Sequence, residues 1–434
     1  MLCYVMYDKS FYAPKLNKNQ LGRQISTNHG VTQGRKSSGN LFSYYISDMP
    51  DTLKPLRKTD FLDPFILLQL ADDTSILAEH FLSLQQKFIK IIQYSQTQYQ
   101  VANIKKTVYC HFSREPTTTP IKIDQNTSIL SIDEKGHVFL GTTYIPTNDI
   151  KEILKINFKK RIKHVAKFYG WLEINTNTPI QTKLLVLDSC VFGALLYASE
   201  TWGDISCISE DLLKTELQIL KRILNIKSGT CSDLVYYELK RPPITLKIRN
   251  RQFKFFEKIK LLSPENATIQ NYMFICNNSR FLNYYESLHG NECKNFLKNQ
   301  DRHIDNDVRS MVVYYRNIVD KRKSCIYTTF TNDYYRKIIT RWRLSNHSLN
   351  IETQRYTRPR ILRENRVCLF CYVLEDENHV LFHCPLYRMI RIKHTKLLSR
   401  NQSLSKIMNP EHRYITHTAN FLYDIEKERE SLKL

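Results

Sequence analysis

Residues that break regular structure are scarce in this sequence. Only 11 glycines and 14 prolines interrupt its 434 residues, which excludes a collagen-like chain and a Pro/Gly-rich disordered one. We find no internal repeat and no low-complexity tract. Hydrophobic residues make up 42% of the chain, an ordinary share for a globular protein. A chain of this length is expected to form roughly two to three domains with their own cores.

Long apolar runs are lacking as well. The chain does not start with a basic region followed by an apolar run, so we expect no secretory signal. The most apolar stretch, 184–202, contains Asp188 and predicts a buried helix, not a membrane span. The 11 cysteines are odd in number and mostly scattered, unlike a disulfide framework. We therefore expect an intracellular protein of the nucleus, the cytoplasm or both, with no membrane partner.

Acidic residues are too few to balance the basic ones. The chain has 42 Asp and Glu against 64 Lys and Arg, a formal net charge of +22. Such an excess repels itself unless a polyanion binds it. Nucleic acid is the first candidate partner, because each neutralised phosphate releases counterions. An anionic membrane surface and a simple bias in composition are the alternatives, since charge alone does not separate them.

The first 145 residues combine strand and helix patterns, whereas the rest is helical. We expect a loop over 30–39, a helix over 40–46, a hairpin over 65–78, a helix over 80–95 and strands over 107–112 and 138–143. From residue 149 a helix should bury one stripe, which comprises Ile150, Ile153, Leu154, Phe158 and Ile162. Ser209 should cap a later helix whose buried face comprises Leu212, Leu213, Leu217, Leu220 and Leu224.

The predicted hairpin over 65–78 carries two adjacent acids, Asp72 and Asp73, between its apolar runs. Carboxylates held at the tip of a hairpin can bind divalent metal, and nucleotidyl transfer uses two metals to hold the attacking and leaving oxygens. Aspartate is also an ordinary turn residue, so the pair alone favours a plain turn.

Five segments between residues 30 and 205 give the acidic pair a context. They are Gly30-Val31-Thr32-Gln33-Gly34 followed by Ser37-Ser38-Gly39-Asn40-Leu41-Phe42, then Leu70-Ala71-Asp72-Asp73, Asn103-Ile104-Lys105-Lys106-Thr107, Phe139-Leu140-Gly141 and Ser199-Glu200-Thr201-Trp202. In this order they resemble the motifs of reverse transcriptases of non-LTR (LINE-like) retrotransposons. The resemblance implies an RNA-directed DNA polymerase that works on an RNA template and a DNA primer or target.

The resemblance also implies roles for individual residues. Asp72 would bind the catalytic Mg²⁺ (or Mn²⁺) ions, with Asp73 as a lesser ligand. Leu70 stands where the family usually has tyrosine, a departure that bears on contacts more than on metal binding. The other implied roles are the nucleotide and template side for Gln33 and Gly34, the leaving pyrophosphate for Lys106 and the primer terminus for Gly141.

One expected part of the polymerase site is missing. In this family a further aspartate, on a strand well upstream of the Gly-Val-x-Gln-Gly loop, completes the metal site. Asp8 is the only acidic residue before Gly30, and its surroundings do not resemble that strand. We therefore expect that this chain alone does not polymerise DNA. An upstream extension of the reading frame would change this expectation.

A Cys/His cluster follows near the C-terminus with the spacing C-x2-C-x7-H-x4-C. Cys368, Cys371, His379 and Cys384 could complete a tetrahedral shell, which with four protein ligands would be a structural Zn²⁺ site. His383 is an alternative fourth ligand, and buried cysteines without a metal are the other interpretation. Non-LTR reverse transcriptases often end in a motif of similar spacing, which favours zinc.

Basic residues flank this cluster and suit contact with phosphates of RNA or DNA, although a solvated charged surface would have the same composition. They are Arg355, Arg358, Arg360, Arg363 and Arg366 on one side, and Arg388, Arg391, Lys393 and His394 on the other. The residues after Cys384 are too few for the endonuclease that such elements need. The sequence therefore fits the branch of the family whose endonuclease precedes the polymerase.

We thus expect an α/β partial polymerase palm, truncated at its N-terminus, followed by an all-α thumb and connector and a zinc knuckle. The predicted segments are the palm (1–145), the helical thumb (146–240), a basic helical connector (241–354) and an arginine-rich segment with the zinc knuckle and a C-terminal helix (355–434). Three interpretations are open: a reverse transcriptase remnant without activity as this chain, a non-catalytic RNA- or DNA-binding protein, and a working polymerase whose frame begins upstream.

Overall fold

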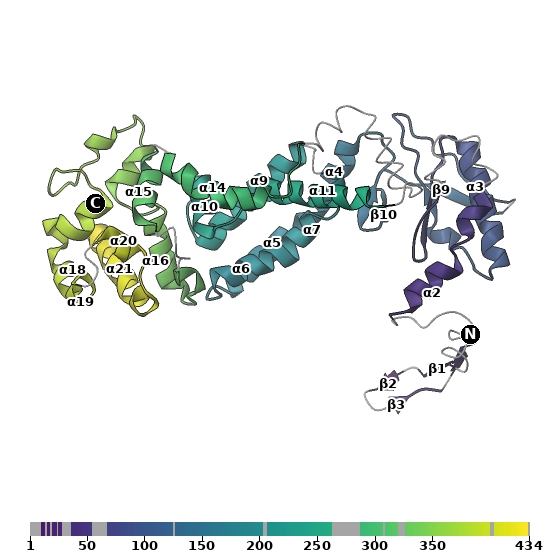
Figure 1. Ribbon diagram of the computed structural model, residues 1–434, viewed down its shortest axis with the longest axis horizontal. Helices are drawn as coiled ribbons and strands as arrows, with labels where there is room; N and C mark the ends of the chain where they lie inside the picture. Colours follow the sequence, from purple (N-terminus) through teal and green to yellow (C-terminus); the bar gives the residue numbers. More distant parts are fainter. Residues whose placement is uncertain are drawn as a thin grey trace. The chain divides into compact units, whose positions relative to one another are not determined.

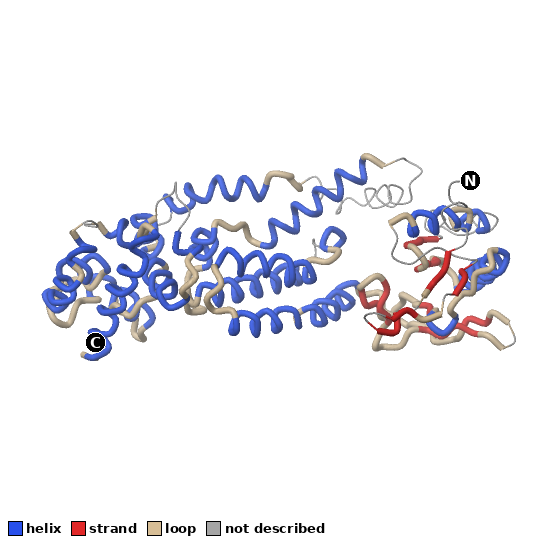
Figure 2. The backbone as a smooth tube through the Cα atoms, turned by 90° about the horizontal axis from the view of Figure 1, so that it is seen from below, coloured by secondary structure: helices blue, strands red, loops and turns tan. Residues whose placement is uncertain are grey.

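The chain divides into two compact units in the computed structural model. The structure describes residues 10–13, 15–17, 20–23, 25–27, 36–53, 67–124, 126–202, 206–262, 287–306, 309–319, 326–399 and 403–432. The N-terminal unit ends at Asn148, and the helical unit begins at Asp149 and runs to the C-terminal helix. Figure 2 shows the strands, in red, in the N-terminal unit. The described residues of the helical unit form helices and turns, apart from one antiparallel bridge between Val367 and Leu374.

Among its described residues, the N-terminal unit contains short antiparallel hairpins and two α-helices. Its first elements are β1 (Ser10–Tyr12) paired with β4 (Ile25–Thr27), β2 (Lys15–Asn17) paired with β3 (Gln20–Leu21), and α2 (Ser38–Tyr45). Next come β5 (Leu67–Leu70) paired antiparallel with β6 (Asp73–Ile76), and α3 (Phe81–Thr97). The β5–β6 hairpin and helix α3 confirm the hairpin predicted over 65–78 and the helix predicted over 80–95. A small core of Ile46, Met49, Leu53, Ile91 and Tyr94 packs against the hairpin residues Leu67 and Ile76.

The remaining strands of this unit form a three-stranded sheet and one more hairpin. The sheet has the order β7 (Val108–Tyr109), β9 (Ser128–Ser131), β8 (Ile121–Lys122), with β7 and β9 parallel. The hairpin joins β10 (His137–Phe139) to β11 (Thr142–Tyr144). The single strand predicted over 138–143 is therefore wrong. Leu140 and Gly141 both have positive φ, 46° and 75°, and form the tight turn that divides it.

The helical unit is built on one continuous apolar core that runs from Leu154 to Ile425. Its elements, many labelled in Figure 1, are α4 (Ile150–Arg161), α5 (Lys163–Ile174), α6 (Ile180–Val186), η4 (Leu187–Phe192), α7 (Gly193–Leu195), α8 (Ser199–Trp202), α9 (Ser206–Leu224), α10 (Ser232–Leu239), α11 (Ile244–Lys260), α14 (Glu292–Asn306), α15 (Ser310–Ile318), η5 (Ile326–Thr329), α16 (Asp333–Arg343), α17 (Asn350–Thr353), η6 (Gln354–Tyr356), η7 (Arg363–Asn365), η8 (His379–His383), η9 (Pro385–Tyr387), α18 (Arg388–Lys393), α19 (Thr395–Leu398), α20 (Leu404–Met408), η10 (His412–Tyr414) and α21 (Ile415–Ser431).

Two helices of this unit differ from their predicted form. Helix α9 begins at Ser206, so Ser209 lies inside it and is not its cap. Ile208 explains the earlier start, because it is buried one turn before Leu212 and extends the apolar stripe of the helix. The stretch 184–202 is not one helix, because a π-helical turn and a break at Ala198 (φ 57°) divide it. No helix among the described residues is long and apolar enough to cross a membrane.

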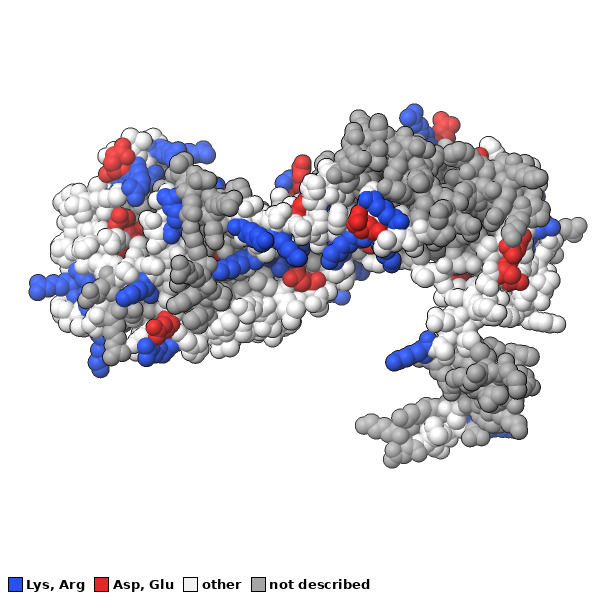
Figure 3. All heavy atoms as spheres, viewed as in Figure 1, with Lys and Arg blue, Asp and Glu red and all other residues white. Residues whose placement is uncertain are grey.

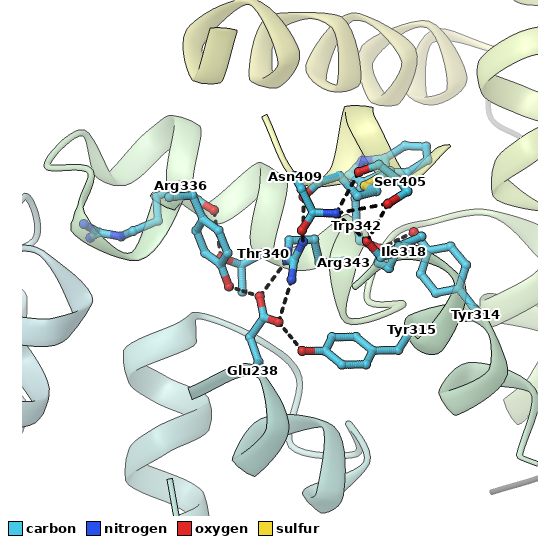
Figure 4. A network of polar contacts seen from close by, with 12 residues as sticks. Glu238, Tyr314, Tyr315, Ile318, Arg336, Thr340, Trp342, Arg343, Ser405 and Asn409 are labelled. Atoms are coloured by element: carbon cyan, nitrogen blue, oxygen red, sulfur yellow. Dashed lines mark hydrogen bonds and ion pairs between the residues drawn. The ribbon is translucent and has the colours of Figure 1, made fainter. Parts of the chain in front are cut away.

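Buried ion pairs fasten the helices of this unit to one another. Glu238 of α10 accepts two hydrogen bonds from Arg343 of α16, at 2.7 and 2.9 Å. The hydroxyls of Tyr315 and Tyr327 also donate to this carboxylate (Figure 4). Arg343 further donates to the carbonyl of Met408 at 2.6 Å. The charge of Glu238 is thus fully paired, as a carboxylate with no exposed surface requires.

Candidate metal centre and acidic hairpin

A short antiparallel bridge sets the first two cysteines of the Cys/His cluster. Val367 pairs with Leu374, and the amide of Cys368 donates to the carbonyl of Val373 at 2.7 Å. The amide of Tyr372, whose φ is +59°, returns a hydrogen bond to the carbonyl of Cys368 at 2.8 Å. This tight turn brings the thiols of Cys368 and Cys371 to the same side, as a C-x2-C metal turn requires.

A π-helical turn, η8, supplies the other two candidate ligands. The amide of Cys384 donates to the carbonyl of His379, five residues earlier, at 2.8 Å. Asp376 fixes the start of the turn, because its carboxylate accepts from the amide of His379 at 2.8 Å. The π-helical turn has one more residue than an α-helical turn, so it places His379 and Cys384, which are five residues apart, next to each other. Both side chains therefore reach the cysteine turn.

The four side chains converge on one point. Their ligand atoms all lie within 4.8 Å of one another. The Sγ atom of Cys384 lies 3.8 Å from that of Cys368 and 3.5 Å from that of Cys371. Sulfurs bound to one zinc at ~2.3 Å stand ~3.8 Å apart in a tetrahedron. A disulfide would bring two of them to ~2.05 Å, so the cluster has the spacing of a metal centre.

The chemistry of the donor set also fits a cation. The Nε2 atom of His379 is buried and has no hydrogen-bond partner in the structure. Burial raises the pKa of Cys371 and raises that of Cys384 to about 12, and burial lowers the pKa of His379. Without a cation the cluster would therefore hold neutral thiols and a neutral imidazole. A bound metal ion would compensate the buried thiolates and accept the lone pair of His379. These four residues can thus hold a metal ion, as the sequence predicts.

His383 does not belong to this group. It is exposed, whereas Cys384 is fully buried, so the structure selects the cysteine as the fourth ligand. Cys384 is held further by Arg391, whose guanidinium donates to its carbonyl at 2.5 Å. Arg391 therefore stabilises the cluster from inside the protein.

A buried network ties the cysteine turn to the C-terminal helix. Arg429 of α21 forms a two-point ion pair with Glu375, at 2.6 and 2.9 Å. The same carboxylate accepts a hydrogen bond from the backbone amide of Asn350 at 2.6 Å. The side-chain amide of Asn350 donates a hydrogen bond to the carbonyl of Val367. This chain of contacts ends next to Cys368. The cluster is therefore part of the main helical core and not a separate small knuckle.

Several of the basic residues that flank the cluster have structural contacts. Arg366 is buried and donates to the carbonyls of Ile351 and Ile361. Lys393 and His394 both contact Asp424, at 2.8 and 2.7 Å. Arg366 thus cannot reach a phosphate, against the expectation from the sequence. The exposed flanking residues are Arg358, Arg360, Arg363, Arg388 and Lys393, the last of them paired with Asp424.

The turn between the first two cysteines presents apolar side chains to solvent, a feature that the sequence argument missed. The exposed side chains are Leu369 (54%), Phe370 (56%), Tyr372 (78%) and Val373 (48%). The signal was available in the sequence, because Leu369 and Phe370 lie between two metal ligands and Tyr372 and Val373 follow directly. Four exposed apolar side chains on six residues suggest a contact surface. We call these four residues the apolar tip.

The acidic pair lies on the turn of the β5–β6 hairpin. Leu70 pairs with Asp73, so Ala71 and Asp72 form a two-residue turn, with Ala71 at φ +53°. Both carboxylates are exposed. Among the described residues no third ligating side chain is grouped with them, so the structure gives no support for a Mg²⁺ site.

The other residues implied by the family resemblance lie on separate elements where the structure describes them. Lys106 is exposed and ends a 3₁₀ turn capped by Asn103. Gly141 lies in the β10–β11 turn. Trp202 is buried and donates to the carbonyl of Tyr197 at 3.0 Å, a structural role. Gln33 and Gly34 lie outside the described residues.

The sequence matches no known protein-family model, and no curated protein is significantly similar to it.

Proposed function

We propose that this chain is a zinc-stabilised nucleic-acid-binding protein of the non-LTR reverse transcriptase kind, and that its helical unit binds single-stranded RNA or DNA. The observation that carries the proposal is the turn between two metal ligands, which presents exposed apolar side chains close in sequence to exposed arginines. The excess of basic over acidic residues along the chain agrees with a polyanionic partner.

Zinc is the metal that best suits the Cys/His cluster. Three thiolates and one imidazole are soft donors, which favour zinc over magnesium or calcium. Four protein ligands leave no open position for water or substrate, so the ion would be structural. In this protein it would fix the cysteine turn, and with it the position of the apolar tip. The residues that hold the ion are Cys368, Cys371, His379 and Cys384.

The apolar tip has the chemistry of a stacking surface for unpaired bases. Every base has a π face, so Phe370 and Tyr372 can stack on single-stranded nucleic acid without strong sequence preference. A duplex hides these faces inside its stack. A tip held rigid by metal loses little conformational entropy on binding, which favours affinity. The tip therefore suits a single strand better than a duplex.

Exposed arginines supply the complementary charge. Arg358, Arg360 and Arg363 are exposed and precede the apolar tip in the chain. Burial lowers the pKa of Arg366, and the nearby charges of Arg360 and Arg363 lower it further, which indicates that positive charge gathers here. On the face drawn in Figure 3, Lys and Arg side chains are spread over the helical unit, with fewer Asp and Glu side chains. Such a surface would contact phosphates and position the strand.

The test is the affinity of the zinc-loaded full chain for a labelled single-stranded RNA, measured by fluorescence anisotropy. Leu369→Ala combined with Phe370→Ala should weaken binding by about tenfold, because it removes the stacking ring of Phe370 and the apolar contact of Leu369. Ile174→Ala combined with Leu185→Ala is the matched control, because it also removes two exposed apolar side chains of the helical unit. Log affinity should also fall linearly with log salt concentration. Equal affinity of the tip variant and the control would refute the proposal.

RNA-directed DNA polymerisation is a second candidate, favoured by the tight hairpin that presents Asp72 and Asp73. Mg²⁺ at this hairpin would supply the two-metal chemistry of nucleotidyl transfer. Primer extension on an RNA template separates the candidates. Product from the wild-type chain that disappears in Asp72→Asn would establish the polymerase. We expect no product from either chain, because no further carboxylate is grouped with Asp72 among the described residues.

A further inference from the structure

A cavity of about 380 Å³, lined by both polar and apolar surface, lies in the helical unit apart from the residues of the metal centre. Three segments line it: Lys227–Thr230 after α9, Ser345–His347 after α16, and the α17–η6 region with Glu352, Thr353 and Tyr356. Its volume lies within the ~300–1,000 Å³ range of small-molecule sites. Tyr356 begins the stretch that leads to Arg358, Arg360 and Arg363, so the cavity and the proposed binding surface are adjacent in the chain.

The walls of the cavity are held in place by specific hydrogen bonds. The Asn346 side chain accepts from the amide of Lys227 at 3.0 Å and donates to the hydroxyl of Thr230 at 2.5 Å. This one amide group thus clamps the 227–230 loop against the 345–347 turn. On the other side, Glu352 forms an ion pair with Arg355 at 2.6 Å. The cavity is therefore a built feature, not a gap between loose loops.

The floor of the cavity carries a polar group without a partner. Ser345 is only 7% exposed, and its hydroxyl has no hydrogen-bond partner in the structure. An unpaired buried hydroxyl is unfavourable unless something completes it. Ser345 also lies in the left-handed region, at φ 50°, where residues other than glycine are uncommon. The unpaired hydroxyl indicates that a ligand or water completes this site.

The charges of the lining favour a neutral ligand over a phosphate. Lys227 is the one Lys or Arg among the lining residues and is exposed, and the Nε2 atom of His347, which also lines the cavity, lies 2.9 Å from Glu377. The lining also carries the carboxyl of Glu352, which is paired with Arg355 at 2.6 Å and so adds no net positive charge that would attract an anion. Burial raises the pKa of Glu352 to about 7, so near neutral pH this carboxyl can both donate and accept a hydrogen bond. A heterocycle with donors and acceptors on one edge matches such a floor.

We propose that this cavity accepts one unstacked nucleobase of the bound strand, with Ser345 and Glu352 reading its polar edge, the ring of Tyr356 against its face and Lys227 beside its phosphate. Tyr356 is 62% exposed at the rim, where an aromatic ring can stack on an entering base. The inference rests on the proposed single-strand binding and adds a base-recognition site to it.

The test compares two labelled ten-nucleotide strands, one of RNA and one in which every base is absent, on the zinc-loaded full chain. Ser228→Trp should block the cavity mouth, because Ser228 is exposed and lines it. We expect this variant to bind the RNA about tenfold more weakly and the abasic strand unchanged. Ser431→Trp, the same substitution at an exposed residue of α21, should affect neither strand. Ser345→Ala should weaken RNA binding alone by a smaller factor.

A second measurement separates this inference from the proposed function. Saturation-transfer NMR would detect the four ribonucleoside 5′-monophosphates on the same proteins. Monophosphate binding that Ser228→Trp abolishes, together with no affinity for the RNA strand, would leave the cavity standing and overturn the proposed function. Equal RNA affinity of Ser228→Trp and wild type, or an equal loss for both strands, would overturn the base site.

Discussion

The Cys/His cluster and the acidic hairpin differ in how completely the fold supports them. At the cluster four donor side chains meet within 4.8 Å, and a buried hydrogen-bond network surrounds them. At the hairpin two carboxylates stand exposed on a turn, and no further ligand is grouped with them among the described residues. A metal ion needs a closed set of donors held in place by outer contacts. The comparison therefore favours the cluster as the site that this chain can build by itself.

The largest expected effect comes from removing a ligand of the cluster. Cys384→Ser should abolish metal binding and destabilise the helical unit, because binding energy of a structural zinc, on the order of 10 kcal/mol, is folding energy. Thermal unfolding and metal content would measure both losses. Cys190→Ser is the control, since Cys190 is an exposed free cysteine and should change neither quantity. A Cys384→Ser protein with wild-type stability would show that the cluster is packing alone.

The outer network should give the next largest effect. Arg429→Met leaves the carboxylate of Glu375 buried and unpaired, since both side chains are 2% exposed. Loss of one partner of such a pair costs about 3–5 kcal/mol of the free energy of unfolding. Chemical denaturation would measure it, with Arg413→Met as control, because its pair with Glu411 is exposed. Equal losses in the two variants would mean that the Arg429 pair does not support the cysteine turn.

A pH-dependent contribution should come from the cavity wall. Burial raises the pKa of Glu352 to about 7, above its ordinary value of 4.5, so the folded chain binds this proton more tightly than the unfolded chain. Stability from this group is then present at low pH and is lost as pH rises from 4.5 through 7. Glu352→Gln should remain neutral throughout. Its free energy of unfolding relative to wild type should therefore rise by about 1–3 kcal/mol between pH 4.5 and pH 8, in addition to a constant offset from the changed contact with Arg355.

Denaturation curves at several pH values would test this prediction. Glu411→Gln serves as the control, because Glu411 is exposed and should give no such pH-dependent difference. A constant difference between Glu352→Gln and wild type across this range would contradict a buried carboxyl that titrates near neutral pH.

The smallest effect is expected at the hairpin. Asp72→Asn changes an exposed turn residue, so the free energy of unfolding should stay within about 0.5 kcal/mol of wild type. The same variant should retain wild-type zinc content and single-strand affinity. A large stability loss on this substitution, or a gain in unfolding temperature with added Mg²⁺ that Asp72→Asn removes, would mean that the hairpin has partners beyond those described.

Local sequence patterns predicted the parts of the two sites that depend on neighbours in the chain. The C-x2-C turn and the hairpin follow from spacing and alternation, and the structure has both. The network behind the cluster was not predictable in this way, because Arg429 and Glu375 are 54 residues apart in the sequence. The cavity was not predictable either, because the hydrogen bond that joins its walls links Asn346 to Thr230, 116 residues earlier in the sequence. Such partners are chosen by tertiary packing, which single-sequence patterns do not contain.

Two of the predictions that failed concern element boundaries. The cap expected at Ser209 ignored Ile208, whose burial extends helix α9 by a turn. The strand expected over 138–143 ignored the capacity of Gly141 for positive φ, which allows a tight turn there. In both places a residue type whose effect depends on packing or backbone freedom decided the outcome.

The most direct test of the account is the metal content and coordination of the purified full chain. Elemental analysis should find one zinc per chain in the wild type and none in Cys371→Ser. Cobalt substitution should give the visible absorption of a tetrahedral site with thiolate ligands in the wild type alone. Wild-type protein that binds no zinc, or a Cys371→Ser variant that binds zinc and cobalt as the wild type does, would contradict the claim that these four side chains hold a structural metal.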